Sequence, residues 1–349
     1  MEVLCSKGQS CVTHNPTPDR VAYLDVIRIM ATLGVIALHV YCTDYQAAVG
    51  TYNWFVSVIG DGLVRWSVPL FVMISGALFL QPAKEVTYRL LLKKYIPRLL
   101  LAYVFWSLAY SAIKGMVYCI DGREFQIGIL VPHFHLWYLP LLIGVYLLIP
   151  ILRKISSDGR LMRVVLALWI VYLAGCFCRL DLLPQVGILF EPNSIVGFAG
   201  YFLLGHYVRQ HDITRKQARW IYLIGIMGAA VCVCGSIVIS YLRGVSDTSF
   251  LNYIGIPVVA MSLALFVLVK QTTPFVEFKW TRIVDYVRKD LFGIYLTHGL
   301  WLMVFNTPLF RNLCSTFLTL PLITIVIFFL SLYTTKLLRL VPLLRKTVE

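Results

Sequence analysis

The chain has 349 residues, of which 59% are hydrophobic and only 14% are charged. This composition excludes a soluble globular protein and is typical of a membrane protein with several spans. The formal net charge of +14 does not indicate nucleic-acid binding, because most Lys and Arg residues lie between the apolar segments.

Residues 1–20 are polar and contain two prolines, so they are predicted to form a disordered cytoplasmic tail and not a cleaved signal peptide. Ten apolar stretches follow that are long enough to cross a bilayer as helices, at about 17–25 residues for most of them. They cover 21–42, 54–80, 95–118, 133–152, 161–178, 195–208, 220–241, 252–269, 291–310 and 317–338. The sequence therefore predicts an all-α integral membrane bundle over 21–340, with 341–349 as a second cytoplasmic tail.

The distribution of basic residues predicts the orientation. When successive connections are assigned to alternate sides, 24 of the 31 Lys and Arg residues fall on the side of both termini. Because cytoplasmic loops carry the excess of positive charge, both termini are expected to be cytoplasmic. Arg28 and Arg65 are the two cations that lie inside predicted spans.

The first span carries an intramembrane cation and an imidazole. Arg28 and His39 are eleven residues apart, which is within about 20° of three helical turns, so they share a helix face at a separation of about 16 Å. Asp25 lies one turn before Arg28 and can pair with it. A structural ion pair and an interfacial histidine would also explain these residues, but ionisable groups inside a membrane usually mark a functional site or conduit.

The second span contains a further pair, Asp61 and Arg65, at a spacing of four residues. Gly60, Gly62 and Pro69 in the same stretch predict a broken or kinked helix. Such a break either lines a watery cavity or is a simple kink with a structural ion pair.

The fourth and ninth spans add candidate pocket residues. His133, His135 and Tyr138 lie where the fourth span begins, and His298 lies within the ninth. An aromatic belt also explains Tyr138, and a hydrogen bond to a neighbouring helix also explains His298. No metal site is expected, because histidines two residues apart on one helix do not converge.

These segments together resemble a known family. YLDVIRIMATLGVIALHV has the Asp-x-x-Arg start and the Arg-x10-His spacing of the membrane-bound acyltransferase family 3, the sugar O-acyltransferases. RWSVPLFVMISGALFL, HFHLWYLPLLIGVYLLIPIL and LFGIYLTHGL are similar to that family's second, fourth and ninth spans. The resemblance is to members that have only the membrane domain, of the enterobacterial common antigen O-acetyltransferase type.

The resemblance implies transfer of an acetyl group from cytoplasmic acetyl-CoA, across the bacterial inner membrane, to a hydroxyl of a lipid-linked sugar or surface polysaccharide. His39 matches the family's essential histidine and is expected to be the general base, because imidazole titrates near neutral pH. Arg28 and Arg65 match its arginines and are expected to bind CoA phosphate or to stabilise a developing oxyanion.

Asp25, His135, Tyr138 and His298 are then expected to line the substrate pocket, with Asp25 orienting Arg28. The alternative function is a transporter or flippase of a lipid-linked sugar or polysaccharide, because intramembrane charges and a broken helix also suit transport. In either case Arg28 and His39 are expected to face one conduit between the two sides of the membrane.

Overall fold

The computed structural model of the protein describes residues 21–42, 45, 47–118, 133–177, 192–273, 279–307 and 319–349. All regular secondary structure within these ranges is helical, which confirms the expected all-α membrane bundle. The tail at 1–20 lies outside the described residues. The helices, including one π-helical turn (η2) and one 3-10 turn (η3), are α1 (Ala22–Tyr41), α2 (Tyr52–Val64), α3 (Ser67–Phe79), α4 (Tyr88–Leu90), η2 (Leu91–Tyr95), α5 (Ile96–Tyr118), α7 (Tyr138–Ser157), α8 (Gly159–Phe177), α9 (Pro192–Gln210), α10 (Arg215–Arg243), η3 (Ser249–Leu251), α11 (Ile256–Thr272), α12 (Lys279–Val287), α13 (Leu291–Phe305), α15 (Thr319–Leu340) and α16 (Pro342–Val348).

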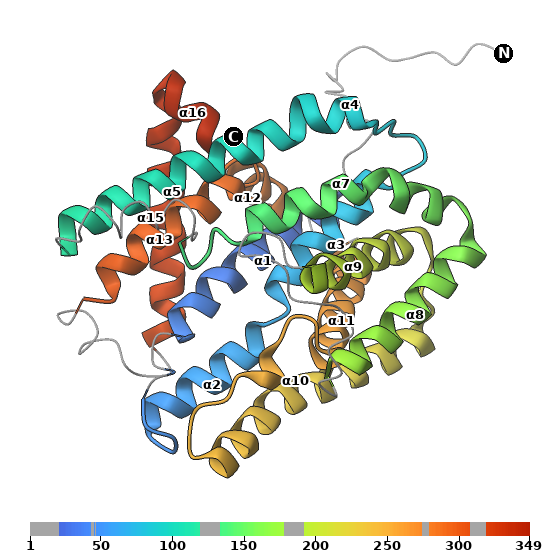
Figure 1. Ribbon diagram of the computed structural model, residues 1–349, viewed down its shortest axis with the longest axis horizontal. Coiled ribbons are helices and arrows are strands. Elements are labelled where there is room, and N and C mark those ends of the chain that lie inside the picture. Colours follow the sequence, from blue (N-terminus) through green and yellow to red (C-terminus); the bar gives the residue numbers. More distant parts are fainter. Residues whose placement is uncertain are drawn as a thin grey trace, which may run out of the picture.

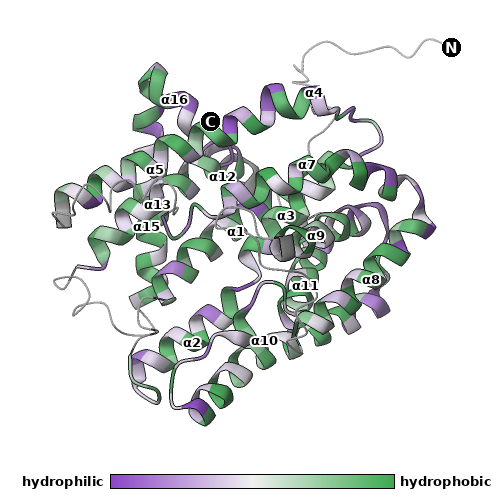
Figure 2. Ribbon diagram, viewed as in Figure 1, coloured by the Kyte–Doolittle hydropathy of each residue, from purple (hydrophilic) through white to green (hydrophobic). Residues whose placement is uncertain are grey.

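Each of the ten predicted spans overlaps helix in the structure. Within the described ranges, eight helical segments are long and apolar enough to cross a membrane. α13 is apolar but has only 15 residues, and α9 has 19 residues but is not among the eight. Figure 2 shows apolar residues along most of the helices and hydrophilic residues near many helix ends and connections. The chain is therefore a multi-pass membrane protein, whereas the exact number of ten spans stays a prediction.

The helix α1 runs through the middle of the bundle (Figure 1). It packs against α2, α3, α11, α13 and α15. Because neighbours surround it, α1 buries Leu24, Ile27, Ala31 and Ile36 almost completely. Polar side chains on such a helix face other protein groups or an internal cavity, and this places Arg28 and His39 where a site can form.

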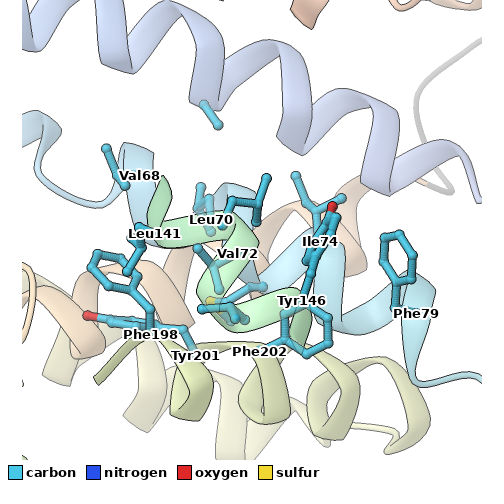
Figure 3. Close-up of a cluster of buried hydrophobic side chains, with 14 of the residues drawn as sticks. Val68, Leu70, Val72, Ile74, Phe79, Leu141, Tyr146, Phe198, Tyr201 and Phe202 are labelled. Atoms are coloured by element: carbon cyan, nitrogen blue, oxygen red, sulfur yellow. The ribbon is translucent and has the colours of Figure 1, made fainter. Parts of the chain in front are cut away.

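Part of the main hydrophobic core lies between α3, α7 and α9, where aliphatic and aromatic side chains interdigitate (Figure 3). The α3 and α9 backbones approach closely at two glycines. A Cβ atom on Gly76 would collide with the backbone of Phe202, and one on Gly205 would collide with the backbone of Met73. Small residues permit such approach, and helices in membranes associate through close packing of this kind.

Cations at one end of the bundle bond to the carbonyl ends of helices. Arg209 donates to the carbonyl of Ala77 at 2.8 Å, and Arg153 donates to that of Phe79 at 2.7 Å, both near the C-terminus of α3. Lys270 donates to the carbonyls of Val208 and His211 at 2.7 and 2.8 Å, at the C-terminus of α9. The last carbonyls of a helix have no partner within that helix and carry the negative end of its dipole, so cations are favourable there. Basic residues that predict the orientation thus also cap helices.

The residues predicted as a C-terminal tail are ordered against the bundle. α16 packs against α5, α13 and α15, and it buries Thr347 and Val348. The indole of Trp106 donates to the carbonyl of Thr347 at 3.3 Å, and Arg339 pairs with Glu349 at 2.8 Å. Residues 342–348 therefore form part of the folded unit.

Candidate active site

Arg28 and His39 lie on the side of α1 that faces α13 and the start of α7. Arg28 pairs with Asp25 at 3.5 Å, as their spacing predicts, and 31% of its side chain is exposed. His39 contacts residues of α13 and of the turn that precedes α7. The helical periodicity of α1 thus positions both side chains as the sequence indicates.

A cavity of about 140 Å³ contains the Arg28 side chain. Residues of α1, α3, α7 and α13 line it: Arg28, Phe71, Ile74, Ser75, Tyr138, Leu142, Leu291, Phe292 and Tyr295. Tyr138, predicted as a pocket residue, therefore shares a cavity with Arg28. Asp25 and His39 are not among the lining residues. The cavity is mostly apolar, with one cation, one serine hydroxyl and two tyrosines as its polar groups.

Three predicted site histidines converge beyond this cavity. The ring of His39 stacks on that of His298, with centroids 5.5 Å apart, and lies 6.4 Å from that of His135. The rings of His135 and His298 are 4.7 Å apart, and both residues are buried. Separate chain segments thus bring one histidine each to the same place.

The segment at 133–137 is a turn, whereas the sequence predicts that the fourth span is helical from His133 onward. The hydroxyl of Tyr295 donates to the carbonyl of His135 within this turn. The turn also changes the relation of His133 to His135, because their Nδ1 atoms lie 3.2 Å apart. On a regular helix, side chains two residues apart would point to different faces.

Tyr295 joins the cavity to the histidine cluster. Its ring lines the cavity and lies 5.9 Å from that of Tyr138, while its hydroxyl bonds to His135. Its carbonyl accepts a hydrogen bond from Nδ1 of His298 at 2.5 Å. The expected conduit from Arg28 to His39 is therefore not continuous in this cavity, because Tyr295 stands between them.

The second predicted span breaks between α2 and α3, at Arg65 and Trp66. Pro69 has no N–H to bond the carbonyl of Arg65, which is where a continuous helix would require one. Asp61, fully buried, pairs with Arg65 and also accepts a hydrogen bond from the hydroxyl of Tyr45. The Arg65 guanidinium lies over the ring of Tyr253 at 5.1 Å. The break and the ion pair are both as the sequence predicts.

The Asp61–Arg65 pair lies at the His39 end of α1 and does not line the Arg28 cavity. The ring of Tyr41 packs against Gly60, and the ring of Trp66 packs against Gly34. Asp61 and Arg65 fall between these two contacts, so their level along α1 lies between Gly34 and Tyr41. The sequence assigns Arg65 the same candidate tasks as Arg28, whereas the structure separates the two arginines.

Several residues of the site were not singled out from the sequence. Tyr295 and Phe292 line the cavity, and Arg98 lies over the Phe292 ring at 5.3 Å. Gly299 faces His135, because a Cβ atom there would lie 2.6 Å from Cε1 of that ring. The spacing of Tyr295 was the available signal, since it lies three residues before His298 and four before Gly299, and residues three or four apart share a helix face.

Residues 21–336 match the family of acyltransferase domains. The chain belongs to this acyltransferase family. The match covers most of the chain and includes all ten predicted spans but the last two residues of the tenth. Comparisons with curated proteins and with solved structures gave no significant match.

This family is the membrane-bound acyltransferase family 3 that the sequence resembles, and membership of it gives no support to the transporter alternative. It also shows that the intramembrane cluster belongs to a membrane acyltransferase. Among the described residues of this acyltransferase, no group of three or more His, Cys, Asp or Glu side chains is arranged to hold a metal ion.

Proposed function

We propose that this protein transfers an acetyl group from acetyl-CoA to a hydroxyl of a lipid-linked sugar or surface polysaccharide in the bacterial inner membrane. One observation carries the proposal: a cavity with a cation and a cluster of three histidines adjoin within the bundle, on either side of Tyr295. The cavity with its cation suits an anionic thioester donor, and the histidine cluster suits proton transfer from a hydroxyl.

The donor is assigned to the Arg28 cavity. Arg28 is partly exposed and its guanidinium can bind a phosphate with two parallel hydrogen bonds, with Asp25 orienting it. The apolar walls formed by Phe71, Leu142 and Phe292 suit the pantetheine arm. The thioester reaches the histidines when the arm passes Tyr295. A cytoplasmic N-terminus places this cavity toward the compartment that supplies acetyl-CoA.

The chemistry is assigned to the histidine cluster. The imidazole of His39 takes the proton of the acceptor hydroxyl as the oxygen attacks the thioester carbonyl. The new C–O bond forms, the C–S bond breaks, and the proton passes to the sulfur of CoA. His135 and His298 line the acceptor side of this position. No net proton is consumed, so the site needs no external acid or base.

Arg65 is assigned an electrostatic role near His39. Its pairing with Asp61, away from the Arg28 cavity, supports stabilisation of negative charge at the reaction centre over binding of phosphate. A preorganised cation in a site that excludes water is effective for this task. The pair sits at a helix break, so its position is fixed by the packing of Trp66 on α1.

The proposal is tested with inside-out membrane vesicles given acetyl-CoA that is labelled in the acetyl group. Label is expected to appear in glycan with the wild-type protein and with the control variant His211→Ala, which lies outside the cluster. It is expected to be absent with His39→Ala at equal amounts of inserted protein. A deletion strain is expected to lose acetyl groups from one surface polymer, which identifies the acceptor.

Two outcomes contradict the proposal. Unchanged labelling by His39→Ala would remove His39 as the base. Movement of glycan across the membrane without any label would replace acyl transfer by transport.

A further inference from the structure

Two buried imidazole nitrogen atoms in the histidine cluster have no hydrogen-bond partner among the described residues. They are the Nε2 atoms of His135 and His298. His135 and His298 are at most 1% exposed, and their rings lie 4.7 Å apart. A buried polar atom without a partner is costly, so two of them side by side indicate a group that binds there.

The hydrogen bond on the other side of the His298 ring fixes one requirement for that group, and the tautomer of His135 sets the other. A carbonyl only accepts, so Nδ1 of His298 carries the hydrogen that it donates to Tyr295, and Nε2 of the neutral ring is an acceptor. The Nδ1 atoms of His133 and His135 share one hydrogen bond. The direction of this bond depends on the tautomers of the two rings. With His133 as the donor, Nε2 of His135 carries a hydrogen and is a donor, and the subsite inferred below requires this arrangement. One acceptor beside one donor is complementary to a single hydroxyl group.

We infer that His135 and His298 form a subsite for a second hydroxyl of the acceptor sugar, adjacent to the hydroxyl that is acylated at His39. This inference rests on the proposed function. The bound hydroxyl donates to His298 and accepts from His135. The substrate class is therefore a glycan whose acylated carbon has a neighbour with a free hydroxyl. His298 is a specificity-determining residue in this scheme, and His39 remains the base.

The ring of Phe134 lies beside the subsite, 5.0 Å from that of His135. Its ring is 46% exposed and lies 4.7 Å from that of His39 and 4.4 Å from that of His133. An aromatic ring at this position offers an apolar face to the sugar.

The test pairs substrate analogues with two variants of His298. The acceptor probe is the methyl glycoside of the sugar that loses its acetyl group in the deletion strain. It is compared with analogues that each lack one hydroxyl neighbouring the acetylated carbon. His298→Asn keeps an amide N–H for the Tyr295 carbonyl but has no atom at the Nε2 position, whereas His298→Gln places an amide oxygen or nitrogen near that position.

The wild type is expected to use one deoxy analogue with about 10- to 100-fold lower kcat/KM than the parent glycoside, because a site built for a hydroxyl is left unpaired. His298→Asn is expected to have the same kcat/KM for the parent glycoside and for the analogue. This value should equal the kcat/KM of the wild type with the analogue. His298→Gln is expected to regain part of the preference. Slow hydrolysis of acetyl-CoA without any sugar is measured in each protein as a separate readout of the base.

An equal loss with parent and analogues in His298→Asn, or the absence of any preference in the wild type, would overturn the subsite. A parallel loss of acetyl-CoA hydrolysis in His298→Asn would instead make His298 the base and overturn the assignment. A wild type that transfers no acetyl group to any sugar would refute the proposed function itself.

Discussion

At the scale of single residues, Tyr295 makes the two halves of the site interdependent. Its ring is a wall of the Arg28 cavity, its hydroxyl fixes the turn that carries His135, and its carbonyl fixes the His298 ring. One side chain and its own peptide group therefore set the geometry of two histidines. A donor that enters the cavity meets this residue before it meets the histidine cluster.

Arg28 is expected to contribute through the shape of its guanidinium as well as its charge. Arg28→Ala should raise the KM for acetyl-CoA by about 10- to 100-fold, because a charged hydrogen bond is worth about 1.5–3 kcal/mol. Arg28→Lys should cost less, since it keeps the charge but loses the planar fork. The measurement is the KM of vesicles, with Arg288→Ala as an exposed control. Equal losses in the Ala and Lys variants would argue against phosphate binding.

Gly299 is expected to tolerate no side chain. In Gly299→Ala the new Cβ atom would lie 2.6 Å from His135 and 2.7 Å from the hydroxyl of Tyr110, both of which are buried. Overpacking of this kind costs about 1–3 kcal/mol of stability. It should displace His135 and lower the rate of acetyl transfer by about 10- to 100-fold. Gly159→Ala is the control, because its nearest neighbour would be 3.7 Å away. Full activity of Gly299→Ala would show that the position of His135 is unimportant.

At the scale of elements, the sequence predicts what local chemistry decides. Apolar length locates each span, and the period of the helix places Arg28 and His39 on one side of α1. Gly60, Gly62 and Pro69 indicate the break in the second span, because the missing N–H of Pro69 is a property of that residue alone. The pairs Asp25–Arg28 and Asp61–Arg65 follow from spacings of three and four residues.

What the sequence does not predict depends on contacts between distant elements. The sequence at 133–137 resembles the start of an apolar helix, but in the structure it is a turn whose His135 carbonyl accepts a hydrogen bond from the Tyr295 hydroxyl of α13. The separation of Arg65 from the Arg28 cavity depends likewise on how α2 and α3 cross α1. Neither arrangement leaves a mark on the local sequence, so the sequence assigns His135 and His298 to the substrate pocket but does not predict the ring contacts between them and His39.

Lys270 is expected to stabilise the C-terminal end of α9. Lys270→Met removes a cation that donates to three backbone carbonyls between Val208 and His211. The free energy of unfolding is expected to fall by about 2 kcal/mol, because hydrogen bonds from a charged donor are worth about 1.5–3 kcal/mol. Thermal unfolding in detergent measures the effect, with the exposed Lys216→Met as a matched control. Equal melting temperatures for the two variants would show that this cap contributes nothing.

At the scale of the whole molecule, the orientation in the membrane decides whether the Arg28 cavity faces the cytoplasm, where the proposed donor, acetyl-CoA, is supplied. A green fluorescent protein fused after Glu349 is expected to fluoresce, because the charge distribution predicts a cytoplasmic C-terminus. Alkaline phosphatase inserted at Val245 of the full chain is expected to be active outside. Immunoblots control for the amount of each fusion. An active phosphatase after Glu349 would reverse the orientation and place the donor cavity on the wrong side.

Arg153, Arg209 and Lys270 each have two roles, and this affects the design of orientation experiments. Each of these cations counts toward the positive side of the membrane and also bonds to a helix terminus. Neutralising them would confound a change of topology with a loss of folding. Lys216 and Lys289 are exposed and make no side-chain hydrogen bond or ion pair in the described part of the chain. Neutralising these two residues changes the charge balance without that ambiguity.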